Sequence, residues 1–241
     1  MLRDNKVNLT INTNPKSSFS EAIKTVRTNL HFSSVNKDIK VILVTSPEPG
    51  DGKSFISANL AGAYAQENKR VLIIDCDLRK GRQAEIFKIR KMPTSGYTNL
   101  ILNYSDHSQD IENLERSSYT DFADYIEKTS VKRVDLIPNG PTPPNPIELL
   151  SSNKNKKIIA HLKSIYDIII LDCPPALGLS DTLIMTKFSD ANIVVISSKK
   201  TKSELLAEVK KNFEKANSQI TGVIVNKARI KRSSYYGYYG E

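Results

Sequence analysis

Short apolar runs, several of them rich in β-branched residues, recur along the chain, and segments with helical spacing separate several of these runs. Strands of a parallel sheet are buried on both faces, so they read as continuous apolar runs rather than as alternating ones. The pattern therefore predicts an α/β fold in which helices cover both faces of a mostly parallel sheet. The expected strands are KVILVTS (40–46), RVLIIDCD (70–77), VDLIPNG (134–140), YDIIILDCPP (166–175), DANIVVISS (190–198) and ITGVIVN (220–226).

Helical spacing and loop composition divide the rest of the chain. Residues 1–17 are polar with little periodicity, which predicts a flexible N-terminal arm. One domain over 18–226 and a basic, tyrosine-rich tail over 227–241 complete the expected organisation, and the segment 79–133 indicates weak helices and polar loops. The expected helices are 18–32, 54–69, 147–164 and 203–217.

The composition of the chain argues against several classes of protein. The hydrophobic content of 39% in 241 residues supports a sizeable core. No apolar run approaches the roughly 18–20 residues of a membrane span, and no signal peptide opens the chain, so we expect a cytoplasmic protein. Cys76 and Cys173 each lie inside an apolar run, which indicates small buried residues rather than a disulfide framework. The net charge of +9 does not by itself select a partner, and we expect no nucleic acid.

The stretch SPEPGDGKS (46–54) ends like a phosphate-binding loop. Pro47 stands where the usual G-x-x-x-x-G-K-[ST] pattern has its first glycine. The proline lies at the entry of the loop, away from the backbone donors nearest a phosphate. An expected strand precedes the loop and an expected helix follows it, which is the context that a nucleotide site requires. Backbone donors from Gly50 to Ser54 and the Lys53 ammonium would hold the phosphates of ATP.

Acidic residues stand at the ends of two further expected strands. Asp75 and Asp77 follow one strand, and Asp172 ends another. Ligands of open α/β sheets lie outside the carboxyl ends of the strands, so these carboxylates should face the phosphate loop. Mg²⁺ bound with a nucleotide takes one or two carboxylates together with phosphate oxygens. We therefore expect Ser54, Asp77 and Asp172 to hold Mg²⁺.

The motifs together resemble those of the bacterial tyrosine kinases, which are P-loop proteins unrelated to the eukaryotic protein kinases. The resemblance runs from about residue 18 to residue 241 and is nearest to the separate cytoplasmic kinase of Gram-positive capsule and exopolysaccharide assembly. It implies a P-loop NTPase fold and an ATP-dependent protein-tyrosine kinase. The motifs that carry it, in the order of the family, are EAIKTVRTNL, TSPEPGDGKS, IIDCDLRK, GPTPPNPIELL, YDIIILDCPP and SYYGYYG.

The resemblance implies roles for the site residues. Lys53, Asp75, Asp77 and Asp172 would be catalytic, with Asp75 orienting or deprotonating the acceptor hydroxyl. Arg79 would hold a loop or the tail of a neighbouring subunit, although a solvated arginine is equally compatible with the sequence. Asn226 could contact adenine through its amide. A purely structural role as an asparagine in a turn is almost as compatible with the sequence. The expected nucleotide-binding residues are Pro49, Gly50, Asp51, Gly52, Lys53, Ser54, Phe55 and Asn226.

The resemblance also implies acceptors and partners. Tyr235, Tyr236, Tyr238 and Tyr239 would be autophosphorylated between subunits of a ring-like homo-oligomer. In the family an E-x-x-R-x-x-R motif helps subunits to pack, and this chain has Glu21, Lys24 and Arg27 at those positions. Lysine keeps the charge of arginine but loses its planar fork. The expected partners are a membrane-embedded polysaccharide co-polymerase that activates the kinase and holds it at the membrane, and a phosphotyrosine phosphatase.

Two other functions are compatible with the same nucleotide-binding motifs. A switch ATPase of the partitioning or division-site type would hydrolyse ATP and bind DNA or membrane. Such proteins carry a lysine early in the loop, where this chain has Glu48 and Pro49, and they have no need of a tyrosine cluster. A non-catalytic scaffold would bind nucleotide merely to assemble, but it would not need Lys53, Ser54 and the acidic residues together.

Overall fold

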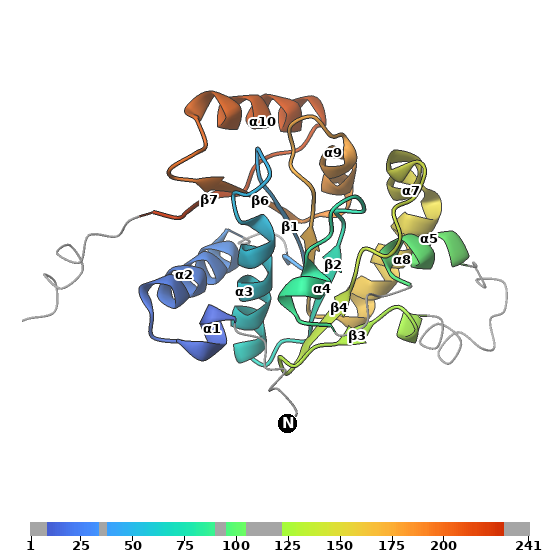
Figure 1. The fold of residues 1–241 in the computed structure, drawn as a ribbon, viewed down its shortest axis with the longest axis horizontal. Helices are drawn as coiled ribbons and strands as arrows, with labels where there is room; N and C mark the ends of the chain where they lie inside the picture. Colours follow the sequence, from blue (N-terminus) through green and yellow to red (C-terminus); the bar gives the residue numbers. More distant parts are fainter. Residues whose placement is uncertain (1–8, 34–37, 90–94, 105–121, 229–241) are drawn as a thin grey trace, which may run out of the picture.

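A seven-stranded sheet runs through the middle of the computed structural model, which describes residues 9–33, 38–89, 95–104 and 122–228 (Figure 1). The strand order is β3-β4-β2-β5-β1-β6-β7. All neighbouring strands pair in parallel except β3, which is antiparallel to β4. The predicted sheet is therefore confirmed, and its strands are β1 Val41–Thr45, β2 Val71–Asp75, β3 Glu127–Lys128, β4 Val134–Ile137, β5 Ile168–Asp172, β6 Ala191–Ser197 and β7 Gly222–Asn226.

Helices cover both faces of the sheet, as the continuous apolar strands predict (Figure 1). One apolar cluster joins the sheet to α1 Thr10–Thr13, α2 Ser18–Phe32, α3 Lys53–Gln66 and α4 Gln83–Ile86. On the opposite face the sheet packs against α5 Tyr97–Asn103, α7 Pro146–Ser151, α8 Asn153–Ile165, α9 Asp181–Met185 and α10 Ser203–Lys215, with a 3₁₀ turn at Thr186–Phe188. Every residue of β1, β2 and β5 is buried, so the three strands that lead into the motifs form the centre of the core.

The expected flexible arm over 1–17 is wrong for its second half. Leu9 and Ile11 are almost completely buried against α3. The backbone N–H of Ile11 donates to Oδ1 of Asn59 at 3.0 Å, and Nε2 of Gln66 donates to the carbonyl of Ile11 at 3.0 Å. Gly62 makes the close approach possible, because a Cβ at this position would lie 2.7 Å from Cγ2 of Ile11. Two buried apolar side chains and these hydrogen bonds therefore hold the segment against α3.

Three further expectations need correction. The helix expected over 147–164 is two helices, because Ser152 adopts an extended conformation, ends α7 and caps α8 through its side chain. The strand β7 is not fully buried, since it lies at the edge of the described sheet and Val225 is 54% exposed. The two-residue strand β3 lies in a stretch where loops and weak helices were expected, and its residues carry no apolar signal.

Candidate active site

The phosphate loop links β1 to α3 at the carboxyl edge of the sheet. Gly50 and Gly52 have φ angles of +89° and +101°, a left-handed conformation that strains residues with a side chain. Gly52 is the N-cap of α3, and no side chain caps this helix. The first backbone N–H groups of the helix therefore stay available for a ligand, and the helix dipole favours an anion there. This geometry matches a phosphate site.

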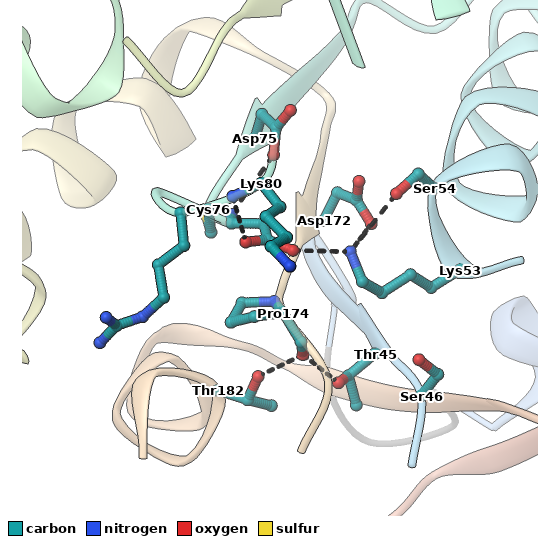
Figure 2. Close-up of polar contacts among 12 residues, drawn as sticks. Thr45, Ser46, Lys53, Ser54, Asp75, Cys76, Lys80, Asp172, Pro174 and Thr182 are labelled. Carbon is teal, nitrogen blue, oxygen red and sulfur yellow. Dashed lines mark hydrogen bonds and ion pairs between the residues drawn. The ribbon is translucent and has the colours of Figure 1, made fainter. Parts of the chain in front are cut away.

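Lys53 lies at the centre of a group of oxygens (Figure 2). Its Nζ is 3.3 Å from Oδ2 of Asp77, 3.4 Å from Oγ of Ser54 and 3.8 Å from Oδ1 of Asp172. The strand order explains this convergence, because β5 lies between β2 and β1 and because Asp75 and Asp172 are register partners. Three oxygen donors around one cation form a donor set that suits Mg²⁺ bound with a nucleotide.

Burial and charge determine the protonation of this cluster. Burial by itself would lower the pKa of Lys53, but Asp172, Asp77 and Asp75 attract the ammonium strongly enough that its pKa is raised above the ordinary value. Lys53 is therefore a permanent cation. Burial, together with repulsion from Asp172, raises the pKa of Asp75 to about 8. The cluster thus contains a carboxyl group whose proton is exchanged near neutral pH, which is the range useful for proton transfer.

The side chains of Asp75 and Asp77 differ in their exposure to the cavity beside the phosphate loop. Asp77 lines a cavity of about 680 Å³ beside the phosphate loop, whereas Asp75 is completely buried behind it. The two oxygens of Asp75 accept hydrogen bonds from the backbone N–H groups of Asp77, at 3.3 Å, and of Gln83, at 2.9 Å. In this conformation Asp75 is therefore not accessible to an acceptor hydroxyl.

Several residues that the sequence reasoning missed hold the site together. The hydroxyls of Thr45 and Thr182 donate to the carbonyl of Pro174 at 2.6 and 2.7 Å, which joins the ends of β1 and β5 to α9 (Figure 2). The hydroxyl of Ser57 donates to Oδ1 of Asp172 at 3.3 Å, and Gln83 donates to the other oxygen of this carboxylate. Thr45 opens the motif TSPEPGDGKS, whereas Ser57, Gln83 and Thr182 belong to none of the motifs, and the role of all four depends on contacts between distant segments.

Asn226, at the end of β7, lies against the phosphate loop. Its Nδ2 donates to the carbonyl of Asp51 at 2.8 Å, and its Oδ1 accepts from the backbone N–H of Lys227 at 2.8 Å. Nζ of Lys227 donates to the carbonyl of Gly50 at 2.6 Å, and Nζ of Lys200 donates to that of Pro49 at 3.1 Å. Through these contacts Asn226 stabilises the phosphate loop. A contact between Asn226 and adenine stays a prediction.

The lining of the cavity beside the loop combines charged and apolar side chains. Nε of Arg79 is 3.3 Å from Oδ2 of the buried Asp181, so Arg79 is anchored within its own chain rather than solely solvated. Six of the eight expected nucleotide-binding residues line this cavity, and the exceptions are Asp51 and Asn226. Phe55 also contacts Phe19 of α2, with ring centroids 5.4 Å apart. The lining consists of Pro49, Gly50, Gly52, Lys53, Ser54, Phe55, Asp77, Arg79, Lys80, Arg82, Glu85, Ile86, Pro175, Leu177, Leu179 and Lys227.

The three expected interface residues of α2 lie in different surroundings. Glu21 and Lys24 pair with each other at 2.8 Å, and the Glu21 side chain is 59% exposed. Arg27 is instead mostly buried, and its guanidinium contacts the carbonyl of Ala63 at 2.7 Å and the carboxylate of Glu67 at 2.6 Å. Arg27 therefore joins α2 to α3 within one subunit, whereas Glu21 and Lys24 are accessible to a neighbour.

The tyrosines expected as acceptors, from Tyr235 to Tyr239, lie outside the described residues. No helix in the described part of the chain is long and apolar enough to cross a membrane. Within the same residues, no three His, Cys, Asp or Glu side chains gather as a candidate metal cluster.

Comparison with known proteins identifies the relatives of this chain. Residues 39–224 match the family described as AAA domain. The tyrosine-protein kinase YwqD of Bacillus subtilis is 38% identical, over 95% of this chain and 89% of the relative. The tyrosine-protein kinase wzc of Salmonella typhimurium is 34% identical over 94% of this chain, which corresponds to 29% of that longer protein.

Solved structures agree with these relatives. The chimerical protein CapA2B2 has a TM-score of 0.80 and 31% identity, covering 92% of this chain and 90% of that one. The septum site-determining protein MinD of Pyrococcus horikoshii has a TM-score of 0.57 and 21% identity over 77% of this chain, which shows a common fold alone. The division-site alternative is therefore not favoured. With the P-loop, the strand-end carboxylates and relatives matched along nearly their full length, the chain belongs to the bacterial tyrosine-protein kinase family.

Proposed function

We propose that this protein transfers the γ-phosphoryl group of Mg²⁺-ATP to tyrosines of its own C-terminal cluster, and that the transfer occurs between subunits. One observation carries the proposal: oxygens of Ser54, Asp77 and Asp172 converge on the Lys53 ammonium at the start of α3. The cluster combines a phosphate-binding helix start with the oxygen donors that accompany a nucleotide-bound cation.

Different residues of the site would bind the phosphates and the Mg²⁺ of the nucleotide. Backbone N–H groups of the 50–54 segment and the Lys53 ammonium would bind the phosphate oxygens. Ser54, Asp77 and Asp172 would hold Mg²⁺ directly or through water. Bound Mg²⁺ would neutralise the charge that develops on the phosphate oxygens during transfer. Lys53 would then leave its present carboxylate partners for the phosphates.

Asp75 is proposed to orient and deprotonate the acceptor. The tyrosine oxygen forms a bond to the γ-phosphorus while the bond from this phosphorus to the bridging oxygen breaks, so ADP leaves. The phenolic proton passes to Asp75, which must be ionised for this step. With its pKa raised to about 8, Asp75 is mostly protonated at neutral pH, so the step uses the ionised fraction, which grows toward pH 8 and is a stronger base than an ordinary aspartate. Movement of the segment 77–83 would give the hydroxyl access.

We infer the acceptors and partners from the resemblance to the family. Tyr235, Tyr236, Tyr238 and Tyr239 are the proposed acceptors, and each phosphate adds about −1.5 to −2 charge. Several such charges beside the basic residues 227–232 would weaken contacts between subunits. We propose that this cycle, reversed by a phosphotyrosine phosphatase, regulates polymerisation and export of a capsular or extracellular polysaccharide. A membrane-embedded co-polymerase would activate the kinase and hold it at the inner face of the membrane.

Intact-mass measurement and peptide mapping after incubation with Mg²⁺-ATP test the proposal. The incubation is done with and without the cytoplasmic segment of the co-polymerase. We expect additions of about 80 Da each, the mass of a phosphoryl group, on the peptide that contains residues 235–239. Lys53→Met should abolish the additions, whereas Lys154→Met, at an exposed lysine, should leave them unchanged. Changing all four tyrosines to Phe should also remove the additions.

The opposite outcome is equally clear. An unmodified tail in the presence of the co-polymerase segment, together with steady hydrolysis of ATP, would contradict the kinase proposal. It would favour the switch ATPase instead.

A further inference from the structure

Gln83 connects three parts of the site although it belongs to no motif. Its side chain is completely buried. Nε2 donates to the carbonyl of Ser54 at 3.0 Å and to Oδ2 of Asp172 at 2.8 Å. The backbone N–H of the same residue donates to Oδ2 of Asp75 at 2.9 Å. One glutamine therefore contacts the start of α3 and both carboxylates that stand in register at the ends of β2 and β5.

The hydrogen bonds fix the orientation of the Gln83 amide. Both acceptors near Nε2 are oxygens, so the flipped amide would place its own oxygen against two oxygens without a hydrogen between them. Oε1 must then face away from Ser54 and Asp172. This oxygen is buried and has no hydrogen-bond donor among the described residues.

The same contacts fix the orientation of Asp172. Gln83 takes Oδ2, which leaves Oδ1 to face the hydroxyl of Ser57 at 3.3 Å and Nζ of Lys53 at 3.8 Å. A carboxylate held at one oxygen cannot rotate freely, so its other oxygen stays aimed at the cation in the site. Groups that orient metal-binding carboxylates from behind commonly decide how tightly the metal is held.

We propose that Gln83 is a positioning residue for the Mg²⁺-nucleotide site, because its Nε2 donates to Asp172 from behind and so orients the other oxygen of this carboxylate toward the cation. The inference rests on the proposed function, because it assumes that Mg²⁺ binds at Asp172.

Nucleotide binding measured by calorimetry, with ADP as the probe, tests this role. The affinity is determined once with saturating Mg²⁺ and once with EDTA, and the ratio of the two affinities is compared between variants. Gln83→Met keeps the length of the side chain and removes both polar atoms. We expect this variant to lower the ratio at least about 10-fold while the affinity in EDTA changes less than about 3-fold.

Two further variants sharpen the test. Gln83→Glu retains an acceptor but places a carboxylate oxygen against Asp172 and the Ser54 carbonyl, so it should lower the ratio as well. Gln66→Met is the matched control, because Nε2 of Gln66 also donates to a backbone carbonyl but lies far from the site. It should leave the ratio at the wild-type value.

Three outcomes would overturn the inference. These are an unchanged ratio in Gln83→Met, equal losses of affinity with and without Mg²⁺, and no effect of Mg²⁺ on ADP binding by the wild type. Equal losses would indicate a purely structural residue, which a lower melting temperature would accompany. The readout is independent of phosphotyrosine, so failure of this inference and failure of the kinase proposal remain distinguishable.

Discussion

At the scale of single residues, the site concentrates charge in a buried place. Asp75 and Asp172 are both completely buried and stand side by side in the sheet, with the Lys53 ammonium as their nearby cation. Buried like charges destabilise a folded protein unless a proton or a cation neutralises them. The protein thus maintains a strained arrangement at the site where a phosphate and a metal would bring new partners.

This strain predicts a pH dependence of stability. The pKa of Asp75 rises from 3.8 to about 8 on folding. Above about pH 4 the unfolded chain releases this proton while the folded chain keeps it, so the free energy of unfolding falls until about pH 8. Asp75→Asn removes this effect. We expect the stability of the wild type relative to the variant to fall by about 3–4 kcal/mol between pH 5 and pH 8, measured by urea denaturation without nucleotide.

A matched variant controls for the general effect of removing a carboxylate. Hydrogen bonding from the backbone of Arg70 lowers the pKa of Asp167, so this group is ionised in both states throughout the window. Asp167→Asn should therefore parallel the wild type. Parallel curves for Asp75→Asn would mean that Asp75 is ionised in the folded protein.

At the scale of elements, α3 supports both the nucleotide loop and the N-terminal segment. Its first residue carries the Lys53 ammonium, and its middle accommodates Ile11 over Gly62. Residues 9–13 therefore cover the same helix that presents the phosphate site, on the face that α2 also packs against.

Burial of Ile11 has a measurable consequence. Ile11→Ala removes a completely buried side chain, and we expect it to lower the free energy of unfolding by about 2–4 kcal/mol. The control is Ile147→Ala, because Ile147 is 42% exposed and its truncation should cost less than about 0.5 kcal/mol. Urea denaturation of both variants gives the comparison. Equal stabilities would show that residues 9–13 do not pack on α3 in solution.

At the scale of the whole molecule, the residues of α2 have two different roles. One residue joins the helix to its own subunit, and others are proposed to contact a neighbouring subunit. Arg27 is held by Ala63 and Glu67 of its own chain, whereas Glu21 is exposed beside Lys24. A ring of subunits that uses this helix would therefore depend on Glu21 and Lys24 for contacts with a neighbour, and on Arg27 for the position of the helix.

Two substitutions distinguish these roles. Arg27→Met should lower the free energy of unfolding by about 1–3 kcal/mol, because it removes a hydrogen bond and leaves its partners unpaired. Glu21→Lys should change stability by less than about 0.5 kcal/mol and reduce the mass of the assembly in sedimentation velocity. An assembly of unchanged mass in Glu21→Lys would exclude this face of α2 from the interface.

The parallel sheet, the phosphate loop and its carboxylates could be predicted from the sequence, because continuous apolar runs and residues at the ends of strands are local signals. The residues that support them could be identified only from contacts in the folded protein. Asn226 braces the loop from across the sheet, and Gln83 joins α3 to two strand ends. The packing of Leu9 and Ile11 on α3 could not be predicted from the sequence either, because it depends on the space over Gly62. Such contacts join segments far apart in the chain, and no local pattern encodes their distance in space.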